Sequence, residues 1–198
     1  MCTAAILAGG RARRLGGRSK ALLPIGDQRI IDHQIAVLRT VADELAIVAA
    51  DTDRYGALGV PVWVDLIPDS GPLGGIYTAL VNATSSHTLI VASDMPFVTA
   101  SFLKYLVRVG QNVDVAIPRT TDGHQPLCAC YAGTCVSVVR RHIESGALKV
   151  TDLLSELKVH EIGPAELQPF DPDDRLFFNV NTPDDYDRCV KLMAGRPE

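Results

Sequence analysis

The apolar residues of the chain gather in short runs that alternate with segments of helical spacing. Runs of about five residues rich in Val, Ile, Leu and Ala predict strands that are buried on both faces. Strands are predicted at 3–7, 45–50, 60–64, 88–92, 113–117, 126–131, 159–162 and 176–180. Helices are predicted at 30–38, 71–82, 101–109, 136–143 and 148–157, with a last helix that begins at Pro183 after Asn181 or Thr182 as its cap. Alternation of this kind predicts an α/β fold, with a mainly parallel sheet covered by helices on both faces.

The domain organisation follows from length and uniformity. The 198 residues contain no low-complexity linker, no repeat and no break in composition. A chain of this length can bury roughly 70% of the surface that it exposes when unfolded. We therefore expect one domain, residues 1–198.

Charge and cysteine content exclude several classes of function. The net charge of −4 gives no general attraction to nucleic acid or to an anionic membrane. No apolar run approaches the ~20 residues of a membrane helix, and the chain enters its first strand without a signal peptide. The five cysteines include no C-x-x-C pair, and their odd number argues against a disulfide framework. These features favour a cytoplasmic protein with reduced thiols.

Two glycine pairs and a cluster of cations follow the first predicted strand. Gly9-Gly10 and Gly16-Gly17 alternate with Arg11, Arg13, Arg14, Arg18 and Lys20. Glycine lets several backbone N–H groups approach one anion, and arginine matches the geometry of phosphate oxygens. The segment lacks the residues of a P-loop and the spacing of a dinucleotide fingerprint. It predicts a phosphate site of another kind.

Carboxylates follow two of the predicted strands. Asp94 comes directly after 88–92 and Ser93, and Asp65 comes directly after 60–64. Ligands of open α/β sheets bind beyond the carboxyl ends of the strands, and Mg²⁺ on a nucleotide prefers carboxylate oxygens. Asp94 is therefore predicted as a magnesium ligand. Asp65 is predicted in the nucleotide site, although Asp69 is close enough to compete for that role.

Two further segments can face the same cleft. The turn Gly71-Pro72-Leu73-Gly74-Gly75 opens a predicted helix, so its N–H groups either face a ligand or only bring the helix close to the sheet. Asn179 and Asn181 place two amides on one face of the last predicted strand. Amides at such a place suit a polar heterocycle.

These motifs, together with His124-Gln125-Pro126-Leu127, resemble in their order the molybdenum cofactor guanylyltransferases, over nearly the whole chain. The resemblance implies a three-layer Rossmann-like nucleotidyltransferase fold and Mg²⁺-dependent transfer of GMP from GTP to molybdenum-bearing molybdopterin. It implies nucleotide contacts from Leu7, Ala8, Gly9, Gly10, Lys20, Asp65 and Asp94, and pterin contacts from Asn179 and Asn181. Arg14, Lys20 and Asp94 would be catalytic, with Asp94 as the metal ligand. Transient contact with other cofactor-biosynthesis proteins or with recipient molybdoenzymes would follow.

Other functions remain open at this stage. The chain has Ser19 and Ala49 where many relatives carry Asp and Asn. One alternative is cytidylyl or other nucleotidyl transfer to molybdopterin or to a small phosphorylated metabolite. Another is a non-catalytic protein that binds a nucleotide or cofactor. Gly9 and the Gly71–Gly75 turn favour GTP over CTP within the resemblance.

Overall fold

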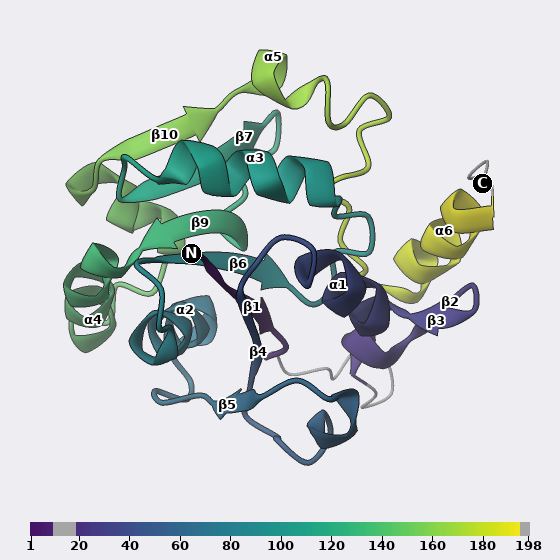
Figure 1. Ribbon diagram of the computed structural model, residues 1–198, viewed down its shortest axis with the longest axis horizontal. Coiled ribbons are helices and arrows are strands. Elements are labelled where there is room, and N and C mark those ends of the chain that lie inside the picture. The colour runs from purple at the N-terminus through teal and green to yellow at the C-terminus, as the bar shows by residue number, and fades with distance from the viewer. Residues whose placement is uncertain (10–18, 195–198) are drawn as a thin grey trace.

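A computed structural model of the chain describes residues 1–9 and 19–194 (Figure 1). The strands are β1 (Thr3–Leu7), β2 (Pro24–Ile25), β3 (Gln28–Arg29), β4 (Glu44–Ala49), β5 (Val62–Val64), β6 (His87–Ala92), β7 (Val115–Thr120), β8 (Gly123–His124), β9 (Cys128–Ala132) and β10 (Val159–Ile162). The α-helices are α1 (Ile30–Leu38), α2 (Gly71–Asn82), α3 (Ala100–Gly110), α4 (Val136–Glu144), α5 (Pro164–Leu167) and α6 (Pro183–Ala194). The 3₁₀ helices of the described residues are η2 (Lys20–Leu22), η3 (Gly56–Leu58), η4 (Gly133–Cys135) and η5 (Val150–Glu156).

The central sheet has the strand order β10-β7-β9-β6-β1-β4-β5, and β8 pairs with β7. The pairs β1–β4, β1–β6, β4–β5 and β7–β10 are parallel, whereas β9 runs antiparallel to both of its neighbours. The predicted mainly parallel sheet is confirmed. Because β1, β4, β5 and β6 are parallel, their carboxyl ends lie at one edge of the sheet.

Helices cover both faces of this sheet, as predicted (Figure 1). Alternate residues of β1 point to opposite faces, so Ala4 and Ile6 join one core while Ala5 and Leu7 join the other. The first core includes apolar residues of α1 and α3. The second includes those of α2 and α4. The result is a three-layer α/β architecture.

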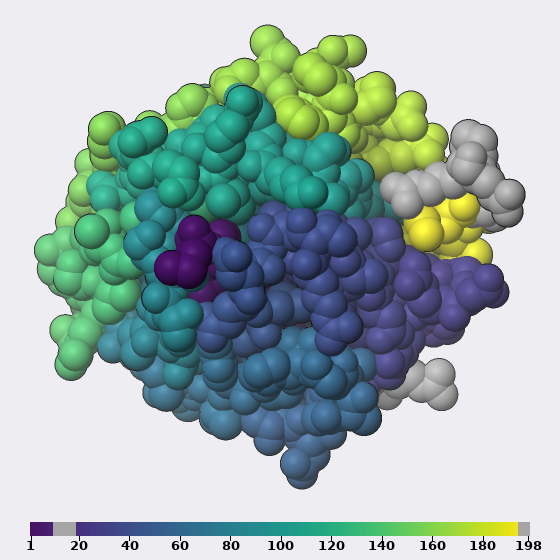
Figure 2. Space-filling model, viewed as in Figure 1, coloured from purple at the N-terminus to yellow at the C-terminus, as the bar shows by residue number. Residues whose placement is uncertain are grey.

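The C-terminal helix belongs to a smaller cluster. Ile25, Ile30, Phe97, Val180 and Cys189 pack together, apart from the two main cores. Figure 2 shows α6, in yellow, beside the purple hairpin β2–β3 at one end of the molecule. None of the described helices is long and apolar enough to cross a bilayer.

Two sequence predictions were wrong in detail. The segment 176–180 is not a strand, because its backbone N–H groups are satisfied elsewhere: that of Leu176 donates to Asp171 and that of Val180 to the carbonyl of Asp94. The segment 148–157 forms the 3₁₀ helix η5 in place of an α-helix. The last helix does begin at Pro183, where Thr182 and Asp185 exchange side-chain-to-backbone hydrogen bonds in a capping box.

Candidate active site

A cavity of about 830 Å³ opens at the carboxyl edge of the four parallel strands. The pairing continues just past the strand ends, since the N–H groups of Ala8, Asp65 and Ser93 donate to the carbonyls of Val48, Ala49 and Leu7. These bonds fix the segments that leave the sheet. The cavity is lined by Leu7, Gly9, Val48, Ala49, Ala50, Asp65, Pro68, Asp69, Gly71, Pro72, Gly75, Ala92, Ser93, Asp94 and Leu127.

Asp94 lies in the turn that follows β6, half-buried at the cavity wall. Its backbone carbonyl accepts a 2.9 Å hydrogen bond from the N–H of Val180. Burial raises the pKa of the Asp94 carboxyl, and the positive charge of Lys20 partly offsets that rise. A carboxylate destabilised in this way gains when a cation binds it.

Lys20 begins η2 and reaches across to the segment before α6. Its Nζ donates a 2.7 Å hydrogen bond to Oδ1 of Asn181. The same ammonium lies near enough to Asp94 to lower the pKa of that carboxyl. A predicted phosphate-binding residue, a predicted metal ligand and a predicted substrate-binding residue therefore meet at one place, although they come from distant parts of the chain.

The hydroxyl of Tyr55 joins the residue before Lys20 to the end of β1. Tyr55 is only 2% exposed, and its hydroxyl lies 2.7 Å from Oγ of Ser19. It also donates a longer, 3.4 Å bond to the carbonyl of Ala8. Ser19 and Ala8 are thus tied to a common buried group.

Asp65 lines the cavity, but one of its oxygens is engaged in local structure. Its Oδ1 accepts hydrogen bonds from the N–H of Ile67 at 3.1 Å and from Oγ1 of Thr78 on α2 at 3.3 Å. Asp69 lines the same cavity in a left-handed backbone conformation, with φ of 65°. Both carboxylates that compete for the nucleotide role thus border the cavity.

The glycines at the start of α2 permit close packing. A Cβ on Gly74 would lie 2.6 Å from the carbonyl oxygen of Ile67, and one on Gly75 would lie 3.2 Å from Cδ1 of Leu7. Gly71, Pro72 and Gly75 also line the cavity, so the N-terminus of α2 is turned toward it. The helix is close to the sheet and next to the cavity at once.

The other predicted residues are placed as follows. Asn179 is half-buried, and its Nδ2 donates to the nearby carbonyl of Phe177. Leu7 and Gly9 line the cavity, and Ala8 lies between them. Gly10 and Arg14 lie outside the described residues.

Within residues 1–9 and 19–194, no group of three or more His, Cys, Asp or Glu side chains is arranged to hold a metal ion. Asp94, the predicted metal ligand, lines the cavity together with Asp65 and Asp69. Mg²⁺ is commonly bound by one or two carboxylates together with the phosphates of a substrate. A half-buried carboxylate whose pKa is raised, beside a cavity large enough for a nucleotide, fits that mode of binding.

Comparison with known proteins decides the family. The family model of the MobA-like NTP transferase domain matches residues 4–160, which is most of the chain. The chain belongs to the MobA-like NTP transferase family. A relative from Carboxydothermus hydrogenoformans, described as a probable molybdenum cofactor guanylyltransferase, is 36% identical over 97% of this chain and 96% of its own length. One of the same description from Pelotomaculum thermopropionicum is 37% identical over 97% and 93%.

A solved structure agrees with this MobA-like assignment. Molybdopterin-guanine dinucleotide biosynthesis protein A from Archaeoglobus fulgidus superposes with a TM-score of 0.85 and 28% identity, covering 99% of this chain and 100% of that one. The predicted resemblance and the Rossmann-like nucleotidyltransferase fold are confirmed.

Sequence reasoning missed two buried side chains that contact the segments leaving the sheet: Tyr55, bonded to Ser19 and Ala8, and Gln34, which donates to the carbonyls of Ala92 and Met95. Tyr55 gives no motif, because an aromatic residue outside a periodic segment has no distinctive pattern. Gln34 does give a signal, since it interrupts the apolar face formed by Ile31, Ile35 and Leu38 of a predicted helix. A polar residue at a core position of this kind needs a buried partner.

Proposed function

We propose that this protein transfers GMP from GTP to the phosphate of molybdenum-bearing molybdopterin and releases pyrophosphate. The observation that carries the proposal is the meeting of Lys20, Asp94 and Asn181 beside the cavity. The names of the relatives, which are similar over nearly the whole chain, support the choice of substrates.

The reaction does not require a strong general base from the protein. An oxygen of the acceptor phosphate is already ionised at neutral pH and attacks the α-phosphorus of GTP in line. The new P–O bond forms as the bond to the bridging oxygen breaks, and pyrophosphate leaves with that electron pair. Catalysis of such a step rests on positioning and on neutralising the charge of the leaving group. Among the described residues, Lys20 lies where its ammonium group can neutralise the leaving pyrophosphate, and its hydrogen bond to Asn181 orients it.

We propose that Asp94 holds Mg²⁺ when GTP is bound. When bound, the ion supplies positive charge to the phosphates of the nucleotide. The raised pKa of Asp94 supports this role, because a buried carboxylate is stabilised by a cation that approaches it. Leu7, Ala8, Gly9 and Gly10 would contact the nucleotide together with Asp65, and Arg14 would assist Lys20 at the phosphates. Asn179 and Asn181 would contact the pterin.

The setting of the reaction is also a proposal. All five cysteines are buried thiols, which supports a reducing, cytoplasmic location. Handover of the product would involve transient contact with other cofactor-biosynthesis proteins or with recipient molybdoenzymes.

The test is pyrophosphate release by the full chain with molybdenum-bearing molybdopterin and Mg²⁺, comparing GTP with CTP, ATP and UTP. We expect release with GTP that depends on the acceptor and is lost in Asp94→Asn. Release with CTP instead would move the protein to cytidylyl transfer. Binding of a nucleotide without release from any of the four would leave a non-catalytic binding protein.

A further inference from the structure

We propose that Gln34 is a positioning residue that fixes the turn carrying Asp94, which rests on the role proposed above for that carboxylate. Gln34 lies on α1 and is fully buried, with 0% of its surface exposed. Its Nε2 donates one hydrogen bond to the carbonyl of Ala92 at 2.8 Å and a second to the carbonyl of Met95 at 2.9 Å. The amide therefore donates both of its N–H groups to the residues on either side of Ser93-Asp94.

The turn is weakly held by its own backbone. The N–H of Met95 donates to the carbonyl of Ala92 over 3.4 Å, which is long for a hydrogen bond. Neighbouring segments supply the other anchors: the N–H of Ser93 donates to the carbonyl of Leu7, and that of Val180 to the carbonyl of Asp94. Gln34 adds an anchor from the helical layer, so β1, α1 and the segment before α6 hold the turn from three directions.

Stability does not explain why a glutamine occupies position 34. Oε1 of Gln34 is buried without a hydrogen-bond partner among the described residues. A buried polar atom in that state typically lowers stability, and an unbranched apolar side chain would avoid the loss. Departures of this kind from good packing are concentrated at functional sites. The two donors, and not the filling of space, explain why an amide suits this place.

The geometry gives the amide a specific consequence for the reaction. A carboxylate that must meet a cation and a nucleotide together has to stay within a fraction of an ångström of its working place. The backbone turn of Asp94 sets that place, and Gln34 contacts the carbonyls at both of its ends. Gln34 touches neither substrate nor metal in this account and acts through Asp94.

The experiment compares Gln34→Met with Ile35→Ala in the full chain. Methionine keeps the length of the side chain but removes both donors. Ile35 is the next residue on α1, is 6% exposed and packs in the core, and its side chain has no polar atom that could bond to the turn, so its truncation is a control for lost packing. Amide hydrogen exchange is measured for Met95 and Val180, with Cys130 of the interior strand β9 as the internal reference. Steady-state kinetics are measured per mole of folded protein.

We expect Gln34→Met to speed exchange at Met95 and Val180 by about tenfold or more relative to Cys130. We expect kcat to fall about tenfold or more and the Mg²⁺ concentration for half-maximal rate to rise, while KM for GTP changes less than about threefold. Ile35→Ala should show no such selective exchange and should keep kcat. Should Gln34→Met fail to fold, the same measurements are made on Gln34→Leu, which removes the same two donors with a shorter apolar side chain.

Two results would overturn the proposal. One is that Gln34→Met changes the exchange rates of Met95, Val180 and Cys130 by the same factor, which means that Gln34 only supports the fold. The other is unchanged kcat and Mg²⁺ dependence despite faster exchange of the turn. If the wild-type chain releases no pyrophosphate, the proposed reaction fails, whereas the exchange data still report whether Gln34 holds the turn.

Discussion

Nζ of Lys20 donates a 2.7 Å hydrogen bond to Oδ1 of Asn181, although 161 positions separate the two residues along the chain. Lys20 follows the first strand and Asn181 precedes the last helix. The bond therefore joins the N-terminal and C-terminal parts of the chain at the site, and Asp94, from the middle of the chain, lies near Lys20. Because the three residues lie together, a substitution at any one of them is expected to disturb the other two.

Lys20→Ala should weaken GTP binding about tenfold to a hundredfold, because a charge-assisted contact to phosphate is worth about 1.5–3 kcal/mol. Titration calorimetry with GTP and Mg²⁺ measures this loss. Lys149→Ala is the matched control, since Lys149 is an exposed lysine paired with Asp152 outside the site. Equal affinity in wild type and Lys20→Ala would remove Lys20 from the phosphate site.

Asp94→Asn should abolish transfer and yet raise the thermal stability of the protein at pH 7. Because burial raises the pKa of Asp94, its ionisation destabilises the folded chain as pH rises from the ordinary value of 3.8 through the raised value. The asparagine has no charge to bury, so the variant should melt about 1–3 °C above wild type at pH 7. The difference should disappear near pH 3, where the carboxyl is protonated in both folded and unfolded chains. A variant that melts below wild type at pH 7 would contradict this account.

Tyr55→Phe should lower the free energy of unfolding by about 1 kcal/mol and raise KM for GTP several-fold, because Ser19 and Ala8 lose their shared partner. Ser19→Ala removes part of the same interaction. Urea unfolding and steady-state kinetics of both variants and of the double variant form a double-mutant cycle. The double variant should lose less than the sum of the single losses, and strict additivity would show that the two hydroxyls act independently.

Gly74→Ala should lower the free energy of unfolding by about 1–3 kcal/mol, because its Cβ would meet the rigid backbone carbonyl of Ile67 at 2.6 Å. Gly75→Ala is the matched comparison, since its Cβ would meet only the flexible end of Leu7 at 3.2 Å. The loss there should be smaller, because a side-chain end can move aside whereas a backbone carbonyl cannot. The helix propensity of alanine, about 1 kcal/mol better than that of glycine, is common to both variants. Urea unfolding ranks the two variants, and a larger loss at Gly75 would reverse the reasoning.

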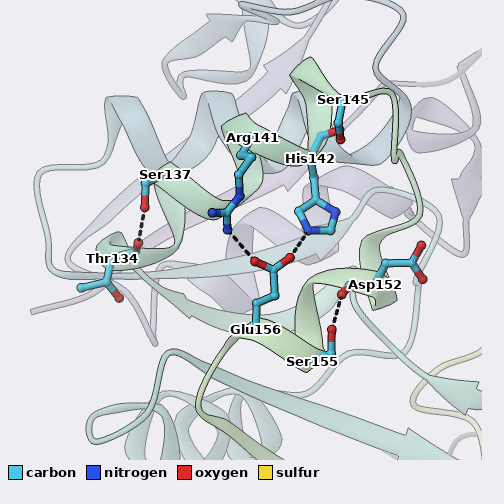
Figure 3. Close-up of polar contacts among 8 residues, drawn as sticks. All are labelled: Thr134, Ser137, Arg141, His142, Ser145, Asp152, Ser155 and Glu156. Carbon is cyan, nitrogen blue, oxygen red and sulfur yellow. Dashed lines mark hydrogen bonds and ion pairs between the residues drawn. The ribbon is translucent and has the colours of Figure 1, made fainter.

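Glu156→Gln should lower the melting temperature slightly at pH 7. The carboxylate of Glu156 joins η5 to α4 by bonds of 2.5 Å to both His142 and Arg141 (Figure 3). These partners hold the pKa of Glu156 below its usual value of 4.5. The stability that the pairs contribute is present above that value and is lost as pH falls through the lowered pKa. The melting curves of variant and wild type should therefore converge in acid, and Glu144→Gln, in the exposed pair with Arg140, is the control.

The sequence predicted the elements whose apolar pattern is set by burial in the sheet or against it. Strands such as 3–7 and 88–92 are fully enclosed, so their composition alone indicates their state. The segment 176–180 has the same apolar character but a different structure, because Asp171 and Asp94 satisfy its N–H groups. Hydrogen bonds to side chains and to distant carbonyls leave no trace in a hydrophobic pattern.

The candidate site was predictable to a similar extent. The places of Asp65 and Asp94 follow from the rule that ligands bind beyond the carboxyl ends of strands. The contact between Lys20 and Asn181 does not follow from any local rule, because it depends on how α6 folds back onto the hairpin β2–β3. The part played by Tyr55 depends likewise on a loop that no periodicity describes.

The small cluster around α6 predicts that one part of the protein opens first when it is heated. Val180 and Cys189 pack with Ile25, Ile30 and Phe97, apart from the two large cores that hold the sheet. Segments with few buried apolar contacts open before the rest of a domain. Detachment of α6 would withdraw Asn181 from Lys20 while the sheet stays folded. Inactivation on heating should therefore precede the loss of circular dichroism and reverse promptly on cooling.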